Sequence, residues 1–204
     1  MKRSMILFAA ALLAALTTTA AALQHQQLVL SQKLVRLHVV ANSDSDYDQE
    51  LKLHVRDAVL QVTEKAGRIE DLALLLPEIQ KAAEYCLAVR GSSYPVAVTL
   101  RRETFPTRDY DAFALPAGPY TALRVTIGTG EGKNWWCVAF PSICLCAASE
   151  VEEAAAAAGL SQEEVKLITK DGGDHVLRFK ALEILQRFKD RWLRPAEQTE
   201  RPKT

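Results

Sequence analysis

The sequence predicts an α+β fold in a single domain, with a mainly antiparallel sheet of about four strands and helices packed largely on one face. The chain of 204 residues is long enough for one domain with a substantial core. Apolar residues make up 49% of it and charged residues 25%, a typical globular composition. Short segments with strand patterns alternate with longer segments of helical periodicity. We expect the folded domain at residues 34–194 and a disordered polar tail at residues 195–204.

The first 22 residues have the pattern of a secretory signal peptide. A positively charged start is followed by the apolar segment Met5–Leu16, and the small residues after it permit cleavage after Ala20 or Ala22. An uncleaved anchor is the alternative, because the apolar stretch extends from Met5 to Leu23 and is just long enough to cross a bilayer. Under either interpretation the rest of the chain is exported.

The first strand and the two helices after it are predicted from apolar spacing. Leu34–Ala41 is a run of β-branched and apolar residues, typical of a buried and central strand. Asn42–Asp46 ends this strand with residues that favour helix N-termini. Apolar residues at helical spacing predict one helix from Tyr47 to Gly67 and another from Glu70 to Arg90. Pro77 either kinks the second of these or begins a new helix.

Three further strands are expected to join the first one. Apolar and polar residues alternate over Tyr94–Arg101, which indicates a half-buried strand. Tyr120–Ile127 and Trp135–Phe140 are separated by the glycine-rich segment 128–133, and this pattern predicts an antiparallel hairpin. The two helices after the first strand are expected to cover the sheet.

The last third of the sequence is predicted to be helical. An alanine-rich helix is expected over Ser149–Ala158. Ser161 and Glu164 have the spacing of a capping box, which indicates the start of another helix. A last helix is expected over Val176–Trp192.

Charge and motif spacing exclude several classes of function. The chain has 25 basic and 25 acidic side chains, so its electrostatics do not indicate nucleic-acid binding. Asp44, Asp46 and Asp48 imitate the start of a calcium loop, but Gln49 replaces the required Gly and Val55 replaces the required Glu. Stabilisation of a helix N-terminus explains these acidic residues without a metal. We expect neither a metal nor another cofactor.

The four cysteines allow several interpretations. Cys86, Cys137, Cys144 and Cys146 fit buried thiols, one disulfide in an oxidising compartment, or, with less suitable spacing, a metal site. If any pair forms, we expect Cys137 with Cys144, because the chain can turn back at Pro141 between them. Cys144 and Cys146 are too close in sequence for ordinary disulfide geometry.

Three segments of the chain resemble the stage II sporulation protein R family. The first is Arg36–Leu60, with its acidic loop and amphipathic helix. The second contains Phe105-Pro106-Thr107 and the segment Leu115–Val125, and the third is Gly128–Pro141, with its Asn-Trp-Trp-Cys core. Together with the export segment, they span residues 1 to about 146 in the order of the family.

The resemblance implies a signalling role without enzymatic activity. Proteins of this family are made in the forespore and exported into the space between the forespore and mother-cell membranes. There they trigger a membrane-embedded aspartic protease that processes the inactive precursor of sigma-E. The partner implied for this chain is therefore that protease, with no nucleic acid and no small-molecule substrate. The alternatives are a cell-wall binding module and a secreted cysteine hydrolase that uses Cys137 with His38 or His54.

A partner-binding surface needs exposed apolar anchors within a polar rim. Strand alternation places the two neighbouring tryptophans on opposite faces, so that both are buried only if both faces are covered. The long irregular segment 105–120 supplies further aromatic residues, and the acidic loop supplies the polar complement. The expected contact residues are Asn42, Asp44, Asp46, Asp48, Phe105, Tyr110, Trp135 and Trp136.

Overall fold

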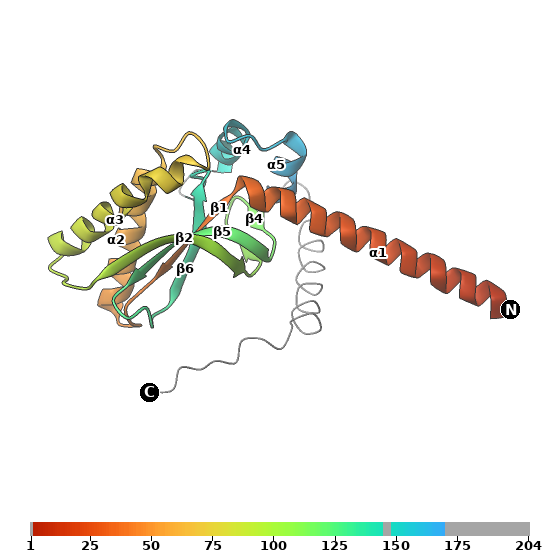
Figure 1. The fold of residues 1–204 in the computed structure, drawn as a ribbon, viewed down its shortest axis with the longest axis horizontal. Coiled ribbons are helices and arrows are strands. Elements are labelled where there is room, and N and C mark those ends of the chain that lie inside the picture. The colour runs from red at the N-terminus through yellow and green to blue at the C-terminus, as the bar shows by residue number, and fades with distance from the viewer. Residues whose placement is uncertain (1, 145–147, 170–204) are drawn as a thin grey trace.

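The computed structural model describes residues 2–144 and 148–169. Its centre is a four-stranded sheet with the strand order β2-β5-β1-β6 (Figure 1). The predicted strands all form, with these bounds: β1 Val35–Val40, β2 Val96–Phe105, β5 Gly118–Ile127 and β6 Asn134–Phe140. The last predicted helix, Val176–Trp192, and the tail 195–204 lie outside the described residues.

Strand β1 is central, as predicted. It pairs parallel with β5 and antiparallel with β6, while β2 pairs antiparallel with β5. The sheet is therefore mainly antiparallel, and the predicted fold class is confirmed. All six residues of β1 are buried, because both faces of the sheet are covered at this strand.

The expected hairpin of Tyr120–Ile127 with Trp135–Phe140 is wrong, since β1 lies between β5 and β6. The segment 128–133 begins with a turn, in which the N–H of Gly130 donates to the carbonyl of Ile127 at 3.1 Å, and then crosses the end of β1. There the N–H of Gly132 donates to the carbonyl of Ala41 at 2.9 Å, and the N–H of Glu131 donates to the carbonyl of Asn42 at 3.2 Å. A glycine-rich linker of this length can span two strand spacings of about 4.8 Å each. Its composition alone does not distinguish this crossing from a hairpin.

Helices α2 (Asp46–Thr63) and α3 (Asp71–Val89) cover one face of the sheet (Figure 1). Helix α3 continues through Pro77 as a single element. The core on this face contains inward residues of β1 and β5 together with the apolar sides of both helices, among them Leu37, Val39, Val55, Ile79 and Val125. The two long helices thus lie on one side of the sheet, as the apolar spacing predicted.

Part of the opposite face is covered by shorter segments that form a second core. They are the end of α1 (Lys2–Lys33), β4 (Ala114–Leu115), α4 (Ala148–Ala157) and α5 (Gln162–Ile168). The exposed strand β3 (Arg108–Asp109) pairs with β4. Ser161 caps α5, and its capping box with Glu164 is confirmed. Buried residues of this second core include Leu30, Phe105, Leu115, Tyr120 and Val165.

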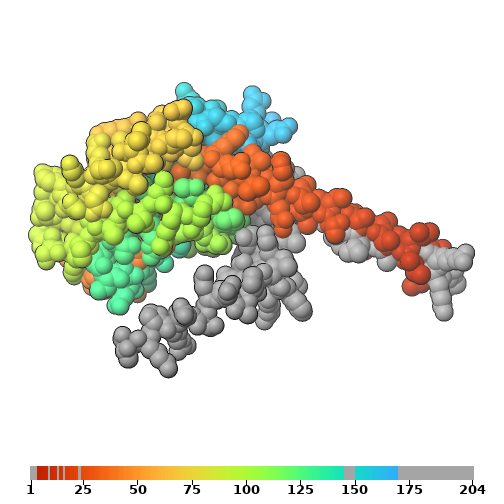
Figure 2. Space-filling view, viewed as in Figure 1, coloured from red at the N-terminus to blue at the C-terminus, as the bar shows by residue number. Residues whose placement is uncertain are grey.

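Helix α1 projects from the body of the protein as a long rod (Figure 2). Its segment Ser4–Lys33 has a mean hydropathy of 2.1 over its most apolar window and is long and apolar enough to cross a membrane. The end of the helix nevertheless belongs to the fold, because Gln27 and Leu30 are buried. Cleavage after Ala22 would leave these packed residues on the domain.

Candidate functional site

The polar segment 42–49, called here the acidic loop, folds over the end of β1, and Asn42 organises it. The Asn42 Oδ1 atom accepts the N–H of Thr129 at 3.0 Å, and its Nδ2 atom donates to Asp48 Oδ2 at 2.9 Å. Gly128 has a φ of 58°, and a Cβ atom there would lie 2.1 Å from Asn42 Oδ1. The acidic loop and the segment 128–133 therefore fit together only with glycine at position 128.

The acidic residues of the loop accept hydrogen bonds at the start of α2 and from the segment 128–133. Ser45 caps the helix by accepting the N–H of Asp48. Burial opposes ionisation of Asp48, but hydrogen bonds from Ser43 and Asn42 hold the pKa of this carboxyl below its usual value. Asp44 is exposed, and its Oδ1 atom accepts the N–H of Lys133 at 2.7 Å. Across residues 2–144 and 148–169, no group of three or more His, Cys, Asp or Glu side chains is arranged to hold a metal ion.

A polar cluster around His38 lies on the face of the sheet opposite α2 and α3. The His38 Nδ1 atom is 2.8 Å from Glu103 Oε2, and its Nε2 atom is 2.8 Å from Asn134 Oδ1. The imidazole stacks on the Trp136 ring, with the ring centroids 3.8 Å apart. Both ring nitrogens are engaged and one face of the ring is covered by Trp136, so neighbouring side chains fix the orientation of His38.

Glu103 holds this cluster together. It binds His38, and its Oε1 atom accepts from Arg101 Nε at 2.6 Å and from Arg124 Nη1 at 3.4 Å. Burial opposes the charge of Glu103, but the hydrogen bonds from His38 and Arg101 and the charge of Arg124 keep its pKa below the ordinary value. Its carboxylate therefore stays ionised between three nitrogen-bearing side chains.

Arg36 is a fully buried cation two residues before His38 on the same face of β1. Its Nε atom donates to the Cys137 carbonyl at 3.3 Å, and its Nη2 atom donates to the Tyr110 hydroxyl at 3.1 Å. The guanidinium lies 4.5 Å from the centroid of the Phe105 ring, and its Nη1 atom has no hydrogen-bond partner among the described residues. Within the described chain it forms no ion pair, so contacts with aromatic rings replace a carboxylate.

Trp135 and Trp136 lie on opposite faces of β6, as strand alternation predicted. Trp135 packs against the α2 side of the core, under the guanidinium of Arg56 at 4.4 Å from the ring centroid. Trp136 packs against the second core and stacks on His38. Both indoles are half-buried, so each face of β6 keeps one partly exposed aromatic side chain.

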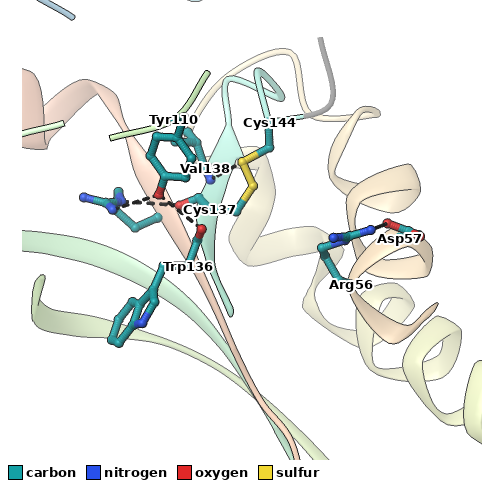
Figure 3. The surroundings of a disulfide bond; sticks show 8 residues. Arg56, Asp57, Tyr110, Trp136, Cys137, Val138 and Cys144 are labelled. Atoms are coloured by element: carbon teal, nitrogen blue, oxygen red, sulfur yellow. Dashed lines mark hydrogen bonds and ion pairs between the residues drawn. A yellow bond between two sulfur atoms is a disulfide. The ribbon is translucent and has the colours of Figure 1, made fainter. Parts of the chain in front are cut away.

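Cys137 and Cys144 are joined by a disulfide, with their Cα atoms 6.0 Å apart (Figure 3). Cys137 points to the α2 side of β6, whereas Trp136, which contacts His38, points to the other side. The sheet thus separates the sulfur of Cys137 from His38. His54 is 40% exposed on α2, where it faces Glu50 in a shallow surface pocket of about 210 Å³. Cys137 is 1% exposed, so the structure does not assemble the cysteine–histidine pair of the hydrolase alternative.

The disulfide leads to a prediction for the purified, exported protein. Mass spectrometry without reduction should find a Cys137–Cys144 cross-link, while Cys86 reacts only after unfolding because burial raises the pKa of its thiol. The cross-link closes a loop with a sequence separation of 7. A Cys137→Ser/Cys144→Ser variant should therefore lose about 2 kcal/mol of unfolding free energy. Detection of Cys137 and Cys144 as free thiols in the native protein would contradict this pairing.

Comparison with known proteins identifies the family. The model of the family described as stage II sporulation protein R matches residues 31–150. This chain belongs to that family. It is similar to stage II sporulation protein R of Bacillus subtilis (strain 168), with 38% identity over 131 residues. The alignment covers 59% of this chain and 58% of that protein, so the chain spans less than two thirds of the relative's length. No solved structure matches the chain.

The region that matches the stage II sporulation protein R family contains the complete central sheet. It begins in the last turns of α1 and ends at the start of α4. The acidic loop, the His38–Glu103 cluster and buried Arg36 all lie within it. Helix α5 follows the matched region.

The contact surface expected from the sequence is divided among several places in the structure. Phe105 as an exposed anchor is wrong, since its side chain is 1% exposed and packs against Tyr120 and Trp136. Asp48 is also buried, and Asn42 is half-buried. Asp44 and Asp46 are exposed at the end of β1, whereas Tyr110 is half-buried on the face that carries Trp136. Trp135 lies on the other face.

Sequence reasoning missed Arg36, Glu103 and Arg124. A signal for Arg36 was present, because Arg36 and His38 are the two polar residues of an otherwise apolar strand and alternate onto one face. No local signal links Glu103 to His38, because the two residues are 65 positions apart and meet only through the pairing of β2, β5 and β1.

Proposed function

We propose that this protein is an exported signalling protein of endospore formation. It is made in the forespore and acts in the space between the forespore and mother-cell membranes. There it activates the membrane-embedded aspartic protease that processes the precursor of sigma-E. The observation that carries this proposal is the family match over residues 31–150, which includes the whole central sheet.

The N-terminal helix supports the export step. Its segment Ser4–Lys33 is apolar enough to cross a membrane and lies at the N-terminus, where signal sequences occur. The domain is joined directly to this helix, because Leu30 belongs to the second core. A retained helix would keep the domain at the membrane surface, close to a membrane-embedded partner.

The arrangement of side chains supports a binding role over the cysteine hydrolase alternative. The sulfur of Cys137 is held in a disulfide and therefore is not a thiolate nucleophile. His38 is packed between Trp136 and Phe105, with both ring nitrogens occupied. The domain exposes acidic and basic residues that are available to contact another protein. Asp44, Asp46 and Tyr110 stay predictions for that contact.

Co-expression in a host that does not sporulate tests the proposed function. The full chain, the protease and the sigma-E precursor would be produced together, and precursor cleavage would be followed by immunoblotting. We expect cleavage only when all three proteins are present. A matched variant without residues 2–22 should fail, because its domain would remain on the cytoplasmic side of the membrane.

A Cys137→Ser/Cys144→Ser variant separates the two functional classes in the same assay. A binding protein that still folds should keep substantial activity, whereas an enzyme with a Cys137 nucleophile should lose nearly all of it. Cleavage of the precursor at the same rate without this chain would overturn the proposed function.

A further inference from the structure

Strand β2 forms one edge of the sheet, and a side chain of α3 closes its first part. The side-chain amide of Gln80 on α3 takes the place of a neighbouring strand there. Its Nε2 atom donates to the Val96 carbonyl at 2.7 Å, and its Oε1 atom accepts the N–H of Val98 at 3.0 Å. This contact identifies the direction in which the free backbone groups of β2 point.

The rest of the same edge has no hydrogen-bond partner among residues 2–144 and 148–169. Backbone groups of an edge strand alternate between its one neighbour and the outside, so the N–H and C=O groups of Leu100, Arg102 and Thr104 point the same way as those of Val98. Among the described residues, none makes a hydrogen bond with these outward groups. Arg102 and Thr104 are exposed. In Figure 2 the yellow-green part of the chain, which includes β2, lies at the surface next to α3.

The charge of this edge favours an acidic ligand. Arg101 and Arg102 are both exposed. Glu103, the acidic residue of the stretch, is turned onto the sheet face and bound to His38, Arg101 and Arg124. The open edge therefore presents positive charge beside unpaired backbone donors and acceptors, and an exposed strand edge of this kind can pair with another chain.

We propose that the β2 edge from Leu100 to Thr104 binds an extended, acidic segment of the partner protein as a fifth strand. This inference rests on the proposed function, because it assigns the edge to the exported side of the activated protease. Backbone hydrogen bonds supply the pairing, and Arg102, which forms no ion pair within the described residues, selects acidic side chains in the added strand. The Gln80 amide limits the added strand to the part of the edge beyond Val98.

A second copy of this chain fits the edge less well. If two copies of the chain paired their β2 edges antiparallel about a two-fold axis at Arg102, the two Arg102 side chains would lie directly opposite each other. Like charges directly opposite each other on paired strands are destabilising. An acidic segment of another protein removes this repulsion and replaces it with attraction.

Two pairs of variants test the edge in the full chain, with precursor cleavage as the readout. Thr104→Pro removes an outward N–H but no bond of the β2–β5 ladder, since proline is tolerated at such edge positions. Thr104→Ala is its control.

Arg102→Glu reverses the charge at the edge, and Lys81→Glu makes the same change on the exposed side of α3. We expect Thr104→Pro and Arg102→Glu to slow cleavage at least about tenfold and the two controls to stay within about twofold of wild type.

Amide hydrogen exchange gives an independent readout. Addition of the purified protease in detergent should slow exchange over residues 100–104 of the exported domain by at least about tenfold, because the outward amides become hydrogen-bonded. Wild-type cleavage rates in both edge variants, with unchanged exchange, would overturn the edge proposal and leave the proposed function intact. Slow exchange at these amides in a dimer of the chain alone would also overturn it. Failure of the wild-type chain to support cleavage would overturn both proposals.

Discussion

Substitution of Gly132 with alanine should destabilise the protein by about 3 kcal/mol, one of the largest effects expected for a single methyl group. A Cβ atom at this position would lie 2.2 Å from the backbone oxygen of Ser43 and 2.9 Å from the Cβ atom of Ala41. The backbone cannot move aside easily, because the N–H of Gly132 is bonded to the carbonyl of Ala41. The added methyl group therefore separates the 128–133 segment from the acidic loop.

Gly67→Ala is the matched control for this substitution. A Cβ atom there would meet Asp71 Oδ2 at 3.6 Å, which is an ordinary contact. Urea unfolding of both variants measures the difference, and the control should change the unfolding free energy by less than about 1 kcal/mol. Equal stabilities of the two variants would show that the acidic loop and the 128–133 segment do not pack as closely as the structure has them.

Glu103→Gln should cost about 2 kcal/mol of unfolding free energy, although it hardly changes side-chain volume. The substitution removes the one carboxylate that lies between His38, Arg101 and Arg124. Arg124 Nη1 lies 3.4 Å from Glu103 Oε1, so the charge of Arg124 loses the carboxylate beside it. The carboxylate is half-buried, and a hydrogen bond to a charged group typically contributes about 1.5–3 kcal/mol. Glu131→Gln in the exposed loop is the control, with an expected change below about 0.5 kcal/mol.

The same variant should change the dependence of stability on pH. The pKa of Glu103 in the folded protein is below its ordinary value of 4.5. As the pH falls below that value, the unfolded chain takes up the proton first, and the stabilisation by Glu103 is lost. The unfolding free energy of the wild type should therefore fall more steeply below about pH 4.5 than that of Glu103→Gln. Parallel pH profiles would indicate that Glu103 does not hold the cluster together.

Patterns within short segments predicted much of the architecture. The run Leu34–Ala41, the alternation in β2 and the capping box at Ser161 each depend on neighbours in sequence, and all three are present in the structure. The opposite orientations of Trp135 and Trp136 followed from the two-residue period of a strand. These features could be predicted because the physical cause and its effect lie within a few residues of each other.

The sequence by itself thus determined the apolar N-terminal segment, the four strands of the central sheet, the positions of α2 and α3 and the cap of α5. Only the tertiary structure decided that β1 lies between β5 and β6, that Phe105 is buried and that Glu103 meets His38. These outcomes depend on which strands pair and on which face each loop packs, and residues far apart in sequence compete for the same partners. Local propensity is similar for the competing arrangements. The observed one is stabilised because both faces of β1 are buried and its backbone groups are paired on both sides, with β5 and with β6.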